Sequence, residues 1–197
     1  GYLDIVLCGT GLSGASCQLY RNNQLGGFAV VSTPFEALTD GDLEWADVNR
    51  DGFADLLITG MGSLGPETQL YLNNQGQSFT QQTVDVPGVY QSTVSWGDLN
   101  QDGFPDLFLG GNLGSSKISH LYLNLNGEQF QLAEVLAPYD EGDAAWADSD
   151  LDGDLDLIIS GSDANDLAGI SLYLNEAGVL TNRALSVEGA YGGTLQW

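Results

Sequence analysis

The chain has 197 residues, of which 27 are acidic and 4 are basic, so its formal net charge is −23. A surface this negative repels phosphate backbones and anionic lipid headgroups, so nucleic acids and acidic membranes are poor candidate partners. Cations remain possible partners. No stretch approaches the roughly 20 apolar residues of a membrane-spanning helix, and we therefore expect no membrane insertion.

The sequence repeats itself about every 50 residues. The four tryptophans mark the period, at Trp45, Trp96, Trp146 and Trp197. Pairs of Leu and Tyr recur in the same phase, at residues 19–20, 70–71, 121–122 and 172–173. A fixed period of this length is typical of repeat architectures. We expect the tryptophans and the Leu-Tyr pairs to be core residues.

Each repeat predicts four short strands in a fixed order. The first ends at the tryptophan, and the second is an apolar run at residues 5–7, 56–58, 107–109 and 157–159. A continuous apolar run predicts a strand that is covered on both faces. The third strand carries the pattern Leu-Tyr-x-Asn, and the fourth includes residues 79–81 and 130–132.

Four strands per repeat predict an all-β fold, a β-propeller of four-stranded antiparallel blades with about four blades of roughly 50 residues. We expect one repeat domain over residues 1–197, with blades at 1–38, 39–88, 89–139 and 140–189. Residues 190–197 would then be the first strand of a further or ring-closing blade.

An aspartate-rich loop of nine residues follows the first strand in each complete repeat. Oxygen-bearing side chains occupy positions 1, 3, 5 and 9, glycine occupies position 6, and the carbonyl at position 7 is a further expected ligand. The predicted metal ligands are Asp47, Asn49, Asp51, Phe53 and Asp55, then Asp98, Asn100, Asp102, Phe104 and Asp106, then Asp148, Asp150, Asp152, Asp154 and Asp156.

These loops favour calcium, at about three sites. Calcium takes six to eight oxygen ligands, whereas magnesium keeps its waters and zinc prefers histidine and cysteine. Several carboxylates within nine residues repel one another unless a cation or protons neutralise them. The alternative is that the loops are acidic turns without a metal.

The loop motif, followed by an apolar strand and Leu-Tyr-x-Asn, resembles the FG-GAP/VCBS repeats. Those repeats form the calcium-binding propeller of integrin α-subunits and of many bacterial and algal surface proteins. The resemblance covers essentially the whole chain and implies an extracellular adhesive or scaffolding role.

At the start of the chain only residues 1–5 match the end of such a loop. We expect the chain to be a slice of a longer array, or to continue in an adjacent copy, and Asp4 alone to hold no metal well.

Cys8 ends the second strand of the first repeat, and Cys17 begins the third. A hairpin register in which paired residue numbers sum to 25 places the two cysteines opposite each other. We predict a disulfide between them, which indicates an oxidising compartment.

The leading hypothesis is an extracellular, secreted or cell-surface calcium-binding module with a structural or adhesive role, whose ligand is a protein or a glycan. The lone His120 gives no catalytic triad without a positioned nucleophile and acid partner, so we do not expect an enzyme. One alternative is a self-assembling subunit of an extracellular filament or surface layer, hence a homo-oligomer. Another is a sugar-binding propeller that uses Tyr90, Tyr139 and Tyr191.

Overall fold

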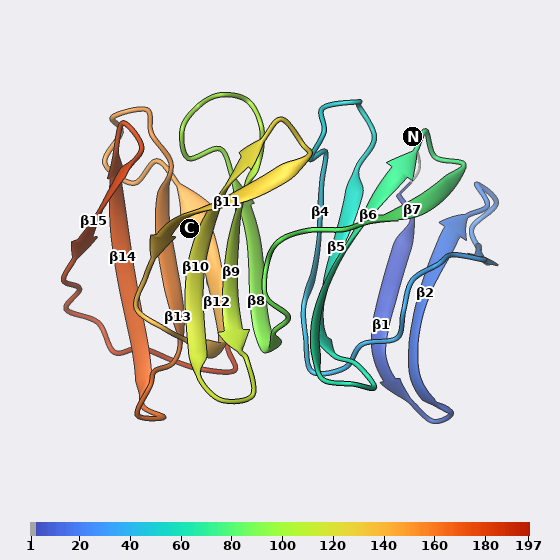
Figure 1. Cartoon of the computed structure of the whole chain (residues 1–197), viewed down its shortest axis with the longest axis horizontal. Coiled ribbons are helices and arrows are strands. Elements are labelled where there is room, and N and C mark those ends of the chain that lie inside the picture. The colour runs from blue at the N-terminus through green and yellow to red at the C-terminus, as the bar shows by residue number, and fades with distance from the viewer. Residues whose placement is uncertain (1–2) are drawn as a thin grey trace.

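The computed structural model describes residues 3–197, which form β-strands joined by turns and loops (Figure 1). The strands group into four antiparallel sheets in chain order. The first sheet has β1 (Ile5–Gly11), β2 (Gly14–Asn22) and β3 (Phe28–Val31). The second has β4 (Leu43–Ala46), β5 (Asp55–Met61), β6 (Pro66–Asn74) and β7 (Ser78–Gln82). The third has β8 (Tyr90–Gly97), β9 (Asp106–Asn112), β10 (Lys117–Leu125) and β11 (Gln129–Val135). The fourth has β12 (Asp140–Ala147), β13 (Asp156–Ser162), β14 (Ala168–Glu176) and β15 (Val179–Arg183).

The all-β prediction is confirmed, with sheets arranged like the blades of a propeller. Within each sheet the strands are hydrogen-bonded in chain order, which is a simple meander. Figure 1 shows the sheets in one row, with β1–β3 at one end and β12–β15 at the other, and they do not close into a ring. The second, third and fourth sheets have the four predicted strands, whereas the first has three. Below, each sheet is called a blade.

The second strand of a four-stranded blade is covered on both faces, as its apolar run predicted. In β9 the side chains of Leu107 and Leu109 pack toward the second blade, and Phe108 packs toward the fourth. All three side chains are at most 1% exposed. Alternating side chains of one strand therefore supply two different cores, one on each side of the sheet.

Three apolar clusters lie between successive blades, so the core of the molecule sits in the interfaces. The cluster between the first and second blades contains Leu19, Phe35, Leu38, Leu56, Ile58 and Tyr71. The next contains Val48, Leu57, Leu70, Val89, Val94, Leu107, Leu109, Ile118, Tyr122 and Phe130. The last contains Leu99, Phe108, Leu121, Leu136, Ala144, Leu157, Ile159 and Tyr173. Most of the Leu-Tyr pairs are thus core residues, as expected.

The tryptophans differ from the expectation that all four are core. A Cβ on Gly97 would lie 2.5 Å from the ring of Trp146, so this ring packs on the backbone of the preceding blade. That contact accounts for the glycine after Trp96, because a Cβ there would clash with the Trp146 ring. Trp45 is 37% exposed, because the three-stranded first blade offers no strand equivalent to β8 for its ring. Trp197 follows the last strand and is 52% exposed.

Residues 190–197 are not a strand in the structure, but they lie along β12. The Gly192 N–H donates to the carbonyl of Glu141, and the Leu195 N–H donates to the Asp143 carboxylate. Gln91 and Val94 of β8 make the same two bonds to Asp40 and Asp42 in the second blade. The segment thus repeats the contacts of a first strand, and the blade boundaries drawn from the sequence stay a prediction.

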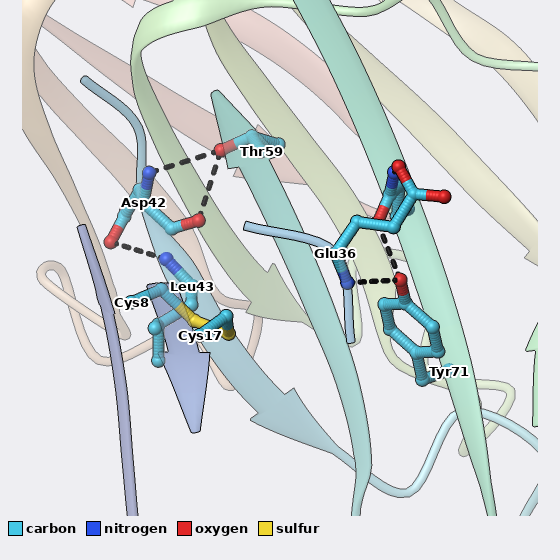
Figure 2. Close-up of a disulfide and its surroundings, with 8 residues drawn as sticks. Cys8, Cys17, Glu36, Asp42, Leu43, Thr59 and Tyr71 are labelled. Atoms are coloured by element: carbon cyan, nitrogen blue, oxygen red, sulfur yellow. Dashed lines mark hydrogen bonds between the residues drawn. A yellow bond between two sulfur atoms is a disulfide. The ribbon is translucent and has the colours of Figure 1, made fainter. Parts of the chain in front are cut away.

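Cys8 and Cys17 lie directly opposite each other on β1 and β2, in the register derived from the sequence. They are joined by a disulfide, as predicted, and Figure 2 shows it beside Leu43 of the second blade. Within residues 3–197 the structure contains no helix of the length and apolar character that a membrane crossing requires.

Glu44 on β4 is a partly buried acid close to two other carboxylates. Its Oε2 atom is buried and meets no hydrogen-bond partner among the described residues. Burial raises the pKa of Glu44 to about 7, repulsion from Asp42 and Asp143 adds to the shift, and the Trp96 backbone N–H opposes it. The folded chain therefore holds this proton more tightly than the unfolded chain, whose glutamate has a pKa near 4.5.

We expect Glu44→Gln to flatten the pH dependence of stability. The proton on Glu44 stabilises the fold fully below the unfolded pKa, and this contribution is lost as the pH rises through about 7. The difference in free energy of unfolding, variant minus natural chain, should therefore be about 1–2 kcal/mol larger at pH 8 than at pH 5, after allowance for solvent screening. Urea unfolding in metal-free buffer at both pH values measures this gain, and parallel pH profiles of the two chains would contradict it.

Candidate metal sites

The three aspartate loops connect the first and second strands of the second, third and fourth blades. They are residues 47–55 between β4 and β5, residues 98–106 between β8 and β9, and residues 148–156 between β12 and β13. All three lie along the upper edge of the row in Figure 1. Equivalent connections in a meander of repeated sheets fall on the same side, so the fold gathers the predicted ligands along one edge.

Hydrogen bonds within each loop turn the carboxylate at position 1 inward. Both oxygens of Asp47 accept backbone N–H groups, from Asp51 at 3.0 Å and from Gly52 at 2.9 Å. Asp98 accepts from Asp102 and Gly103 at 3.0 and 2.9 Å, and Asp148 accepts from Asp152 and Gly153 at 3.1 Å each. The three loops therefore share one conformation, as their common spacing predicted.

The bend at position 6 requires glycine. Gly52, Gly103 and Gly153 have φ values of +89°, +89° and +101°, which side chains with a Cβ rarely adopt. After this bend the carboxylate at position 5 accepts the N–H of position 7. The distances are 2.9 Å from Phe53 to Asp51, 2.8 Å from Phe104 to Asp102 and 2.9 Å from Asp154 to Asp152.

The third loop brings three carboxylates together. Asp148, Asp150 and Asp152 each offer an oxygen, and these oxygens lie within 4.8 Å of one another. Local desolvation and the nearby Asp152 and Asp156 raise the pKa of Asp150, so these charges repel. In the first two loops position 3 is Asn49 or Asn100, whose Oδ1 accepts the N–H of position 5 at 3.0 Å. The amide lowers the charge of those loops but keeps an oxygen in place.

The aspartate at position 9 is fully buried and braces the loop. Asp106 is 0% exposed, and it accepts the N–H of Leu99 at 2.9 Å and the N–H of Asn124 at 2.8 Å. Asp55 and Asp156 make the same two bonds in their blades. Burial raises the pKa of both Asp55 and Asp106 to about 6, although the backbone N–H groups oppose this shift. A nearby cation would therefore favour the charged form of these acids.

The remaining predicted ligands lie as follows. Phe53 and Phe104 offer only their carbonyls, and the Phe104 ring lies under the Arg50 guanidinium, 5.1 Å from its centroid. The Asp154 carboxylate accepts the Ala177 N–H at 2.6 Å, so its side chain points to the β14–β15 turn. Asp4, at the start of the chain, accepts the Asn22 N–H at 2.8 Å, which is the bracing bond of position 9 without the rest of a loop.

Residues at position 4 link neighbouring loops, which the sequence analysis missed. Arg50 donates to the Asp102 carbonyl at 3.4 Å, and Gln101 donates to the Gly153 carbonyl at 3.0 Å and to the Asp154 carboxylate. The asparagine of Leu-Tyr-x-Asn was also given no role beyond its strand. Its recurrence as Asn22, Asn73, Asn124 and Asn175 was the available signal.

The donor atoms of these loops fit a hard divalent cation. The side chains present carboxylate and amide oxygens, and position 7 adds a carbonyl. Oxygens that surround Ca²⁺ at 2.3–2.6 Å lie at most about 5 Å apart, which agrees with the spacing in the third loop. The loops contain no histidine or cysteine, which zinc sites use.

Comparison with known proteins agrees with the repeat pattern. A family model described as an FG-GAP-like repeat matches residues 47–109 and again residues 98–159, which together cover more than half of the chain. Human integrin alpha-6 is 29% identical to the chain over 113 residues. This match covers 50% of the chain and 10% of the integrin, so the chain corresponds to a small part of that relative.

We expect Gly153→Ala to destabilise the third loop through the backbone alone. No atom lies within 4 Å of the added Cβ, so the cost comes from φ of +101° and should be about 1–2 kcal/mol. Gly193→Ala is the control, because its Cβ also meets nothing and its φ is not positive. Urea unfolding of both variants measures the difference, and equal stabilities would contradict the strained bend.

Proposed function

The chain belongs to the FG-GAP-like repeat family, and on that premise we propose that it is an extracellular calcium-binding propeller module with a structural and adhesive role. Calcium would bind the loops at residues 47–55, 98–106 and 148–156 and fix the first two strands of each blade. Three ions would bring the formal net charge to −17.

One observation carries the calcium assignment. The oxygens of Asp148, Asp150 and Asp152 converge within 4.8 Å, and the other two loops repeat the same hydrogen-bonded turn. Carboxylates this close repel in the absence of a counter-charge, whereas a divalent ion turns the repulsion into attraction. The loops are thus arranged for a cation rather than for an apolar contact.

The extracellular location rests on two features. The Cys8–Cys17 disulfide forms and persists in oxidising compartments. The similarity to an integrin chain supports the same location and favours a protein ligand outside the cell. The high negative charge disfavours nucleic acid as a partner. We propose no catalytic role.

Self-association is a second candidate, because the first blade leaves an apolar face exposed. Ile5 and Leu7 of β1 are 47% and 63% exposed, and Phe28 and Val30 of β3 lie on the same face. Their equivalents in the second blade include Leu56 and Ile58, which are buried against the first blade. The face has the chemistry of a blade interface, so copies of the chain could stack head to tail.

The sugar-binding alternative receives less support. Tyr139 packs against Gly169 of the fourth blade, and its hydroxyl lies 3.1 Å from the Ser171 hydroxyl. Blade packing therefore accounts for Tyr139, although Tyr191 is exposed.

We expect calcium to raise the melting temperature strongly. At a free concentration 100 times the Kd, each site adds about 2.7 kcal/mol, so three sites should raise Tm by roughly 15 °C or more. Scanning calorimetry in calcium, in magnesium and in chelator measures this. The combined variant Asp47→Asn, Asp98→Asn, Asp148→Asn is the control, in which the calcium effect should disappear. An identical Tm of the natural chain in calcium and chelator would reject the assignment.

We expect the chain to associate head to tail through the exposed face of the first blade. Sedimentation velocity at increasing concentration should show oligomers of the natural chain. Leu7→Lys with Val30→Lys should leave a monomer, because two charges would have to be desolvated in the interface. A natural chain that stays monomeric at high concentration would reject this candidate.

A further inference from the structure

The asparagine of Leu-Tyr-x-Asn reaches from its own blade into the loop of the preceding one. Asn124 on β10 is 0% exposed. Its Nδ2 donates to the Val48 carbonyl in the second blade at 2.8 Å and to the Pro105 carbonyl of its own loop at 3.1 Å. Its Oδ1 accepts the Gly127 N–H at 2.7 Å. Both donor hydrogens and the acceptor of this amide are thus used.

Asn175 on β14 repeats the arrangement one interface later. It is 1% exposed, and its Nδ2 donates to the Leu99 carbonyl in the third blade at 2.9 Å and to the Leu155 carbonyl at 3.2 Å. Its Oδ1 accepts the Gly178 N–H at 2.8 Å. The same three bonds at two interfaces make the link a property of the repeat.

The carbonyl that these asparagines hold belongs to position 2 of the loop, between the ligands at positions 1 and 3. The N–H of the same residue is held by the position 9 carboxylate, at 3.0 Å for Val48 and 2.9 Å for Leu99. The side chains of Val48 and Leu99 are buried in the interface clusters. The N–H, the carbonyl and the side chain of position 2 are therefore all held in place. This sets the direction of the ligand oxygens at positions 1 and 3.

Ser149 and Asn73 give two comparisons for this link. In the third loop position 2 is the exposed Ser149, whose carbonyl receives no asparagine among residues 3–197, and its hydroxyl donates to Asp156. Asn73 makes the bonds within its blade, to the Ala54 carbonyl at 2.9 Å and from the Gly76 N–H at 2.8 Å. In the described part of the chain it makes no bond to the preceding blade. Asn73→Ala can therefore serve as a comparison for Asn124→Ala, because Asn73 bonds to the Ala54 carbonyl of its own loop.

We propose that Asn124 and Asn175 are positioning residues for calcium, each acting on the loop of the preceding blade. A loop then reaches its binding geometry when the following blade is docked against it. By linkage, calcium in the loop strengthens the docking of that blade by the same factor. The inference rests on the proposed calcium function.

The test is a calcium titration of the full chain followed by ¹H–¹⁵N NMR. The amides of Gly52, Gly103 and Gly153 report one loop each, because each donates to the carboxylate at position 1. Asn124→Ala should weaken binding reported by Gly52 by about 10- to 100-fold, the range for residues that orient metal ligands. The loss of calcium affinity reported by Gly103 should be smaller, because in that loop Asn124 bonds only to the carbonyl of position 8, Pro105.

Matched variants separate positioning from general destabilisation. Asn175→Ala should weaken calcium binding most in the loop that Gly103 reports, and it should leave the calcium affinity reported by Gly52 unchanged. Asn73→Ala, which holds position 8 of the first loop, should affect Gly52 less than Asn124→Ala does. An equal loss at all three glycines, or a loss confined to the loop of the mutated blade, would overturn the inference.

A measurement on the natural chain covers the case in which Asn124→Ala fails to fold. Calcium should slow hydrogen exchange of the side-chain amides of Asn124 and Asn175 more than that of Asn73, and equal exchange rates with and without calcium would overturn the inference. If calcium moves none of the three glycine amides, the proposed function fails and the inference with it. If they respond to calcium but the variants leave the pattern unaltered, the inference alone fails.

Discussion

The buried carboxylate at position 9 is the interaction on which the rest of each complete blade depends. Asp55, Asp106 and Asp156 are at most 1% exposed, and each accepts one N–H from the start of its loop and one from the third strand. A buried anion is costly unless it is hydrogen-bonded and balanced by positive charge. The two N–H groups meet the first need. A cation in the loop would meet the second, so strand pairing and the proposed metal binding would depend on the same side chain.

The blades contact one another mainly through apolar side chains, and three of the four basic side chains lie at the same interfaces. Arg21 donates to the Gly76 carbonyl of the second blade, and Arg50 lies over the loop of the third. Lys117 binds Asp140 and Asp166 of the fourth blade at 2.9 and 2.8 Å. Three of the four basic residues thus each cross a different interface. In so acidic a chain, this placement offsets repulsion where neighbouring blades come closest.

Much of the fold could be predicted because each blade is a local structure. The apolar runs, the loop spacing and the Cys8–Cys17 register depend on residues close in sequence, and the structure agrees with the strand order and with the disulfide. Predictions failed where distant residues decide. The ring of Trp146 packs on Gly97 of the preceding blade, whereas Trp45 is 37% exposed, and a contact between residues 49 positions apart cannot be read from a local pattern.

The sequence by itself determined the repeat, the all-β architecture and the nine-residue loops, since periodicity and turn chemistry act within about 50 residues. Only the tertiary structure shows that the loops at residues 47–55 and 98–106 accept a hydrogen bond from an asparagine of the next blade. Asn124 and Val48 are 76 residues apart, and Asn175 stands at the same separation from Leu99. Such pairs meet because antiparallel sheets of equal size pack face to face, which brings the third strand of one blade against the first loop of another.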